Sequence, residues 1–227
     1  MSVNLINIYQ ILQSRYPHMS GWPDGQWPVS GKFESDLLEI VVGAILAQNT
    51  RWSNVEMALR ELVKEGLVDT TSIDSCSAEK LERTIRSSGF YRQKAIYLKK
   101  VIRLILDCPD FCQKIGREKL LATKGIGPET ADTILLYACH RPFFVVDAYT
   151  RRIFFRYGLL REKANYLEIQ ELFQTHLPLD ITLYQKFHAL VVEHAKQSCR
   201  KTPICVNCAL KDQCRYGLQE SQVSLNC

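Results

Sequence analysis

The sequence lacks any long apolar run, any repeat and any low-complexity tract. No stretch approaches about eighteen uninterrupted apolar residues, which excludes a membrane span. The start, Met1-Ser-Val-Asn, has no basic region followed by a long apolar one, so we expect no secretory signal and a cytoplasmic protein. With 46% apolar and 23% charged residues in 227, the composition also excludes disordered and fibrous classes.

Alternating, strand-like segments are almost absent as well, and apolar residues recur at helical spacing instead. The short run Phe143 to Val146 leads straight into a further helical pattern, and Ser77 is a candidate N-cap. The pattern predicts an all-α protein. The expected helices cover 5–12, 37–46, 53–64, 78–86, 92–106, 117–122, 129–138, 148–157, 166–175 and 181–196.

Cysteine is abundant, with nine residues in a chain expected in a reducing compartment. Five are isolated and are predicted to be bystanders: Cys76, Cys108, Cys112, Cys139 and Cys227. The other four are Cys199, Cys205, Cys208 and Cys214, spaced C-x5-C-x2-C-x5-C. Four thiolates so close together can converge on one soft metal centre. Structural zinc usually takes two short cysteine pairs, so this single compact run favours an iron–sulfur cluster, with zinc as the alternative.

Residues 120–132 predict two helices joined by a tight hairpin. Gly125 and Gly127 permit close approach, Ile126 plugs the turn into the core, and Pro128 suits the first turn of the second helix. Backbone N–H groups at such a turn can hold a phosphate. The alternative is an ordinary interhelical turn, but the neighbouring Lys124 favours the phosphate site.

Asp147 follows the apolar run 143–146 and precedes a predicted helix, so it is expected to be an N-cap. A carboxylate at a helix N-terminus is held ionised and directed outward. Such a group can stabilise an oxocarbenium ion or orient a water molecule.

Together with Ala47-Gln48-Asn49-Thr50 and Gly89 to Ala95, these segments resemble the endonuclease III superfamily of DNA glycosylases over about residues 32–214. The resemblance implies a two-lobed helix–hairpin–helix fold. A six-helix barrel lobe would cover 32–139. The second lobe would combine 1–31 with 140–227 and carry a [4Fe–4S] cluster on the loop 199–214.

Two departures refine what the resemblance implies. Bifunctional members place a Schiff-base lysine two residues after the second hairpin glycine, where this chain has Glu129. Lys124 lies on the other side of the turn. The implied enzyme is therefore monofunctional, without lyase activity, and uses water with Asp147 as the catalytic carboxylate. The first cysteine gap is also one residue shorter than the family's.

The N-terminal segments are similar to the 3-methyladenine glycosylase III branch, whose members lack the iron–sulfur loop. Trp27 with Pro28, Lys32-Phe33-Glu34 and Trp52 carry this likeness. It implies that Trp27 and Trp52 sandwich a flipped, positively charged alkylated purine, with Pro28 and Glu129 beside it. Gln48 is a candidate wedge that fills the space left by the base.

The expected partner is double-stranded DNA containing damaged bases, bound by a monomer in the prokaryotic cytosol and nucleoid. The net charge of +5 supports this, and Lys124, Arg151, Arg152 and Lys94 are candidate phosphate contacts. Two other functions stay open. One is a mismatch thymine or uracil glycosylase on the same scaffold, and the other is a non-catalytic DNA-binding protein with a structural or redox-sensing cluster.

Overall fold

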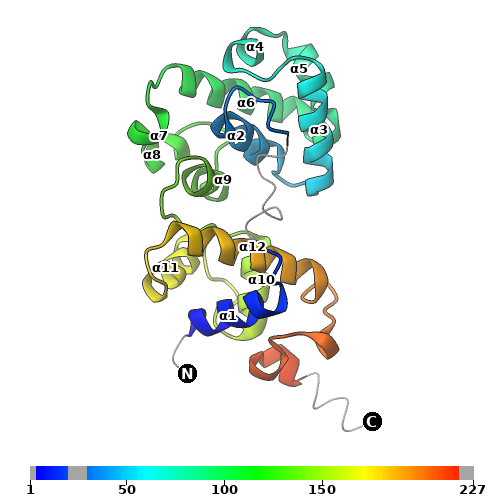
Figure 1. Cartoon of the computed structure of the whole chain (residues 1–227), viewed down its shortest axis with the longest axis vertical. Coiled ribbons are helices and arrows are strands. Elements are labelled where there is room, and N and C mark those ends of the chain that lie inside the picture. The colour runs from blue at the N-terminus through cyan, green and yellow to red at the C-terminus, as the bar shows by residue number, and fades with distance from the viewer. Residues whose placement is uncertain (1–3, 20–29, 220–227) are drawn as a thin grey trace. The chain divides into compact units, whose positions relative to one another are not determined.

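The computed structural model describes residues 4–19 and 30–219, and all regular elements in these ranges are helical (Figure 1). The all-α prediction is therefore confirmed. The chain divides into two compact units, which we call the central unit (27–141) and the terminal unit (1–26 with 142–227). Within the described ranges, no helix is both long and apolar enough to cross a membrane.

The central unit is built around one buried helix, α2 (Asp36–Leu46). Every residue of α2 from Leu38 to Leu46 is buried, and α3, α6, α9 and η2 pack against it. Ser35 caps the helix by accepting a hydrogen bond from the Leu38 N–H. The other elements of this unit are α3 (Trp52–Lys64), α4 (Thr70–Ser75), α5 (Ala78–Thr84), η1 (Arg86–Ser88), α6 (Tyr91–Leu106), α7 (Phe111–Lys114), α8 (Arg117–Leu121), α9 (Pro128–Thr133) and η2 (Ile134–Ala138).

The terminal unit has an aromatic core. The ring of Phe144 stacks on that of Phe173 at 4.1 Å, and Phe154 meets Phe173 edge-on at 4.7 Å. Aromatic pairs in these geometries stabilise a core beyond their buried area. The helices of the unit are α1 (Leu5–Arg15), α10 (Ala148–Tyr157), α11 (Tyr166–His176) and α12 (Ile181–Gln197), followed by the short turns η3 (Cys205–Asn207) and η4 (Lys211–Gln213).

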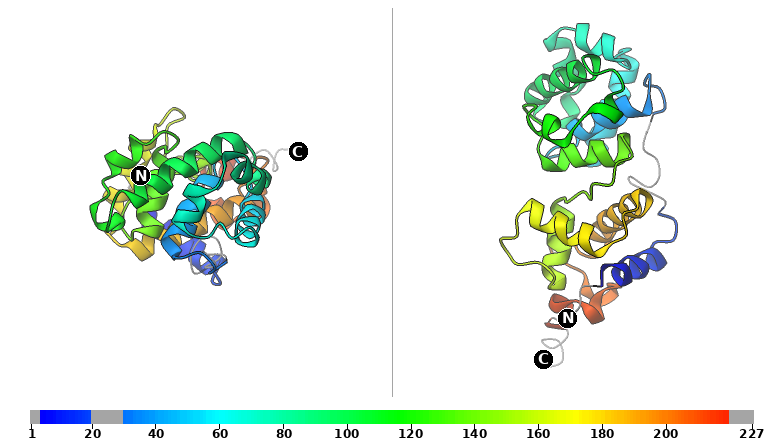
Figure 2. Two further views of the ribbon diagram at one scale, coloured as in Figure 1. Left: turned by 90° about the horizontal axis from the view of Figure 1, so that it is seen from above. Right: turned by 90° about the vertical axis from the view of Figure 1, so that its left-hand side faces the viewer.

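Segments from opposite ends of the sequence meet in the terminal unit. Helix α1 packs on α12, and the rings of Tyr9 and Phe187 lie edge-on at 5.5 Å (Figures 1 and 2). Helix α10 packs on the same α12. As a result, α12 supports both α1 and the helix that begins directly after Asp147.

The expected helices are all present, with small differences at their ends. Ser77 caps α5 as predicted, through a bond from the Lys80 N–H. The helix expected at 129–138 begins at Pro128 and changes to π-helical geometry from Ile134. The short helices α4 and α7 were not expected, because four to six residues give too little apolar periodicity to detect.

Candidate functional site

The predicted hairpin joins α8 to α9 in the central unit. Gly125 has φ +98°, which favours glycine, and a Cβ there would lie 2.2 Å from ring atoms of Tyr97. Ile126 is buried at 5% exposure, as a plug must be. Lys124, Gly127 and Glu129 are exposed around the turn. The geometry is therefore that of a tight turn packed on α6, with polar groups on its open side.

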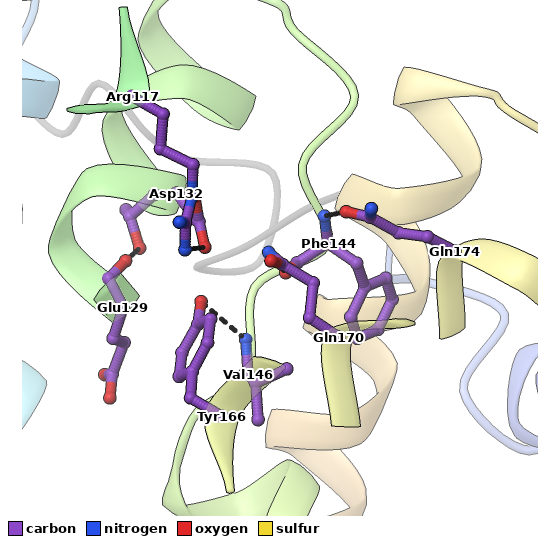
Figure 3. Close-up of polar contacts among 9 residues, drawn as sticks. Arg117, Glu129, Asp132, Phe144, Val146, Tyr166, Gln170 and Gln174 are labelled. Carbon is purple, nitrogen blue, oxygen red and sulfur yellow. Dashed lines mark hydrogen bonds and ion pairs between the residues drawn. The ribbon is translucent and has the colours of Figure 1, made fainter. Parts of the chain in front are cut away.

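A buried ion pair holds the two hairpin helices together. Asp132 of α9 is fully buried, and both its oxygens accept from Arg117 of α8, at 2.6 Å and 3.0 Å (Figure 3). A disulfide between Cys112 and Cys139 joins the start of α7 to the residue after η2. The expectation that both cysteines are bystanders was therefore wrong. The ion pair and the disulfide both restrain the helices that flank the hairpin.

Gln48 lies beside the hairpin. Its amide nitrogen donates to the Gly125 carbonyl at 2.8 Å and to the Thr130 hydroxyl at 3.0 Å. In this conformation Gln48 braces the turn, and the wedge role stays a prediction. Trp52 is the first residue of α3 and is half-buried. Trp27 and Pro28 lie outside the described residues.

Lys94 is not a surface residue, so its expected contact with phosphate was wrong. It is 2% exposed on α6, and its ammonium donates to the carbonyls of Leu46 and Ser88 at 2.8 Å and 2.7 Å. Burial lowers the pKa of Lys94 to about 8. The side chain thus ties the C-terminus of α2, just before Gln48, to the turn that precedes α6.

Phe90 is an exposed aromatic that the sequence analysis had not singled out. It is 71% exposed and has φ +48°, a strained value for a residue with a side chain. An aromatic ring held out in solvent offers a face on which a base can stack. The Phe90 ring is thus available for contact with a partner.

The segment before Asp147 is extended but pairs with no other strand among the described residues. Instead, side chains of α11 satisfy its backbone (Figure 3). Gln174 accepts from the Phe144 N–H at 3.0 Å, Gln170 donates to the Phe144 carbonyl at 2.8 Å, and the Tyr166 hydroxyl accepts from the Val146 N–H at 3.3 Å. Phe144 to Val146 are buried, so this segment fixes where α10 begins.

Asp147 caps α10, as predicted. One carboxylate oxygen, Oδ1, accepts from the backbone N–H and the hydroxyl of Thr150, at 2.7 Å and 2.8 Å. The other, Oδ2, lies 3.6 Å from Nε2 of His188 on α12. Burial acts most strongly on the pKa of Asp147 and would raise it, but the polar contact and charge of His188, together with the two Thr150 bonds, outweigh burial and lower the pKa. Asp147 is therefore held as a carboxylate.

The arginines after Asp147 make contacts within the protein. Arg151 donates to the Ala164 carbonyl. Arg152 donates to the Cys199 carbonyl at 2.9 Å, and its guanidinium lies 5.1 Å from the Tyr149 ring centroid. Contacts of either residue with DNA phosphates stay predictions.

The four clustered cysteines line one cavity in the terminal unit, together with side chains of α10 and α12. Arg156 donates to the Cys199 sulfur at 3.4 Å and to the carbonyls of Arg200 and Lys201. His194 lies 3.5 Å from the Cys208 sulfur through Nε2. Arg156 and His194 thus anchor the loop to α10 and α12.

The chemistry of these donors suits a soft metal group. Burial, followed by the three neighbouring thiols, raises the pKa of Cys208 to about 11, so a cation would be needed to make all four sulfurs thiolates. In the part of the chain described, no three potential ligands are arranged at coordination geometry. The four cysteines are thus of the kind that a four-thiolate group requires, and they line one cavity.

Sequence reasoning missed His188 and the Arg117–Asp132 pair. No spacing rule connects His188 to Asp147, since the contact exists only because α10 packs on α12. Charge complementarity between Arg117 and Asp132 could have suggested their pairing, because a hairpin brings its two helices together.

Comparison with known proteins is consistent with this geometry. Residues 42–178 match the family described as "HhH-GPD superfamily base excision DNA repair protein". The protein named "Putative DNA repair glycosylase MJ1434", from Methanocaldococcus jannaschii, is 42% identical over 219 residues, which is 92% of this chain and 95% of that protein. Endonuclease III of Sulfolobus acidocaldarius is 31% identical over 184 residues, 78% of this chain and 81% of that protein.

Solved structures share the fold. The Helicobacter pylori 3-methyladenine DNA glycosylase MagIII, solved bound to 1,N6-ethenoadenine, superposes with a TM-score of 0.72 and 30% identity, over 86% of this chain and 98% of that one. Endonuclease III in a non-covalent DNA complex gives a TM-score of 0.79 at 21% identity, over 98% of this chain and 100% of that one.

Proposed function

Because this chain belongs to the HhH-GPD superfamily of base excision DNA repair proteins and is a DNA glycosylase, we propose that it removes alkylated purines such as 3-methyladenine and that it does so with water. The proposal depends chiefly on the presence of Glu129. It stands on the hairpin where a Schiff-base lysine is expected in bifunctional members, in a chain 30% identical to a 3-methyladenine glycosylase.

Asp147 would act on the sugar. Its carboxylate is held ionised at the start of α10 and is 12% exposed, so one oxygen can reach the solvent side. As the glycosidic bond breaks, positive charge develops on the sugar, and an anion nearby stabilises it. The same carboxylate can accept a proton from the water that attacks C1′, which completes hydrolysis without an enzyme-bound intermediate.

The lysines support the absence of lyase activity. Lys124 precedes the hairpin glycines rather than following them. Lys94 has a pKa lowered to about 8, as a nucleophilic lysine would need, but it is 2% exposed and donates to two carbonyls. We therefore propose neither residue as a Schiff-base nucleophile.

The base pocket follows from the chemistry of the lesion. An alkylated purine carries positive charge, so its glycosidic bond is already weakened. Aromatic faces attract such a flat cation, with about 1–2 kcal/mol for each ring. Trp52 and Glu129 are the proposed pocket residues in the described ranges, and Trp27 and Pro28 are proposed beside them.

The binding partner is DNA, and we propose that the hairpin contacts its phosphates. Lys124 and Gly127 are exposed at this turn, so the Lys124 ammonium and the Gly127 backbone are the groups proposed to contact a phosphate. Arg151, in the terminal unit, is a separate proposed phosphate contact, which would require it to exchange its bond with the Ala164 carbonyl for a phosphate. The cytosolic, monomeric state stays a prediction.

A panel of lesion-bearing duplexes tests the proposed substrate. We expect rapid release of free base from methylated DNA and slow or no release of thymine or uracil from mismatches, measured by chromatography of the released base. Strands should stay uncut until alkali is added, and borohydride should trap no protein–DNA adduct.

Each other outcome points to a different function. Release of thymine or uracil alone would identify a mismatch glycosylase. Trapping by borohydride would overturn the monofunctional assignment. Tight binding of damaged duplex without release of any base would favour a non-catalytic DNA-binding protein.

We further propose that Cys199, Cys205, Cys208 and Cys214 hold a [4Fe–4S] cluster. When bound, such a group would supply the positive charge that four buried thiolates need and would fix the loop between α10 and α12. Zinc is the competing occupant, because it also accepts four thiolates.

The cofactor is tested by colour and metal content. We expect a brown protein with broad absorbance at about 400 nm and about four irons per chain. Cys205→Ser should abolish the absorbance. Cys76→Ser should not, because Cys76 lies in the central unit as a free thiol. A colourless protein that contains stoichiometric zinc would refute the iron–sulfur assignment.

A further inference from the structure

We propose that His188 is a positioning residue for Asp147, fixing Oδ2 of the carboxylate and keeping it ionised from the neighbouring helix α12. This rests on the proposed role of Asp147 in base release. The role proposed for His188 is additional to the roles proposed for the hairpin, the cysteine loop and the base pocket.

The two oxygens of Asp147 have different surroundings. Oδ1 accepts two hydrogen bonds from Thr150 and is thereby committed to capping α10. Oδ2 receives neither of these bonds and lies 3.6 Å from His188 Nε2. Oδ2 is therefore the oxygen left for water or the sugar, and His188 is the side chain that determines its surroundings.

His188 is part of the buried core of the terminal unit. Its side chain is 5% exposed, and α12 packs along α10 in the same unit. A buried imidazole beside a carboxylate stabilises the anion by donating an N–H and, when protonated, by its charge. At 3.6 Å the contact is longer than a hydrogen bond, so a small movement of α10 or α12 would strengthen or break it.

Other titratable groups nearby are directed elsewhere. Arg151 donates to the Ala164 carbonyl, and the Tyr166 hydroxyl accepts from the Val146 N–H. Tyr184, one turn before His188 on α12, lies edge-on to Phe144 at 5.5 Å. Among the described residues, His188 is thus the titratable side chain that lowers the pKa of Asp147.

Two variants separate the contributions of His188. His188→Gln keeps an N–H donor but cannot carry charge, whereas His188→Leu removes both. We expect the pKa of Asp147 to rise from wild type to His188→Gln and further to His188→Leu, by about one pH unit or more in the last. Carbon-13 NMR of labelled aspartate carboxyls measures it, with the Asp147 signal identified by its loss in Asp147→Asn.

Base release should follow the same order. In single-turnover assays the acidic limb of the pH–rate profile should move to higher pH, because more Asp147 is protonated at a given pH. A midpoint moved by one pH unit costs about tenfold in rate below it. DNA affinity should not change. His176→Gln is the matched control, since His176 is exposed and its ring bonds to the Leu172 carbonyl of its own helix.

The two readouts keep the proposals apart. If the pKa of Asp147 moves in the variants but wild type releases no base from any duplex, the contact is real and the proposed function fails. If wild type releases base and neither variant moves the Asp147 pKa or the pH profile, the role of His188 is overturned. Should His188→Leu not fold, His188→Gln decides by the same measurements.

Discussion

Asp147→Asn should slow base release by about 10²–10⁴-fold while leaving the fold and DNA binding intact. Asparagine can still accept the Thr150 bonds through its carbonyl oxygen, and it caps helices about as well as aspartate. What it lacks is the negative charge that stabilises the sugar cation and the basicity that takes a proton from water. Single-turnover release of base from methylated duplex measures the loss.

Asp180→Asn is the matched control for this substitution. Asp180 caps α12 by accepting from the Leu183 N–H at 2.9 Å, so it does for α12 what Asp147 does for α10. Both changes remove one negative charge from a helix N-terminus of the terminal unit. Equal losses of activity in the two variants, or full activity in Asp147→Asn, would show that Asp147 is only a cap.

Gly125→Ala should destabilise the central unit by roughly 2–4 kcal/mol and weaken DNA binding. The new methyl group would lie 2.2 Å from ring atoms of Tyr97, and alanine is strained at φ +98°. Relief requires the turn to move away from α6, which would also break the bond from Gln48 to the Gly125 carbonyl. Urea denaturation and titration of undamaged duplex measure the two effects.

Gly127→Ala is the control from the same hairpin. Gly127 has φ −89°, and no atom lies within 4 Å of a Cβ placed there. Its free energy of unfolding should change by no more than about 1 kcal/mol. Alanine lowers the entropy of the unfolded chain, which stabilises the fold, but it is a poorer N-cap than glycine, which opposes that gain. If both variants were equally destabilised, the contact between Gly125 and Tyr97 would not be what fixes the turn.

Local features of the site could be predicted from the sequence. Gly125, Ile126 and Pro128 specify a hairpin through their own conformational preferences, and Asp147 specifies a cap because an apolar run ends where a helix begins. The helices were equally accessible, since their apolar faces repeat every three to four residues. These signals lie within a few positions along the chain.

Features that depend on packing could not be predicted. Lys94 looks like any helical surface lysine until the carbonyls of Leu46 and Ser88 are brought to it. Cys112 and Cys139 have no spacing that marks them as a pair. In each case the partner lies on another element, and only the assembled unit determines which groups meet.

The order in which the chain leaves the ribosome has consequences for when the enzyme becomes active. The central unit is continuous and can fold as soon as residues 27–141 have emerged. Helix α1 is made before the central unit, but it packs on α12, which is made after that unit. His188 lies on α12 and the cysteine loop follows it, so we expect the environment of Asp147 to be completed only after both have been made. A nascent chain could therefore present its hairpin to DNA before it is able to excise a base.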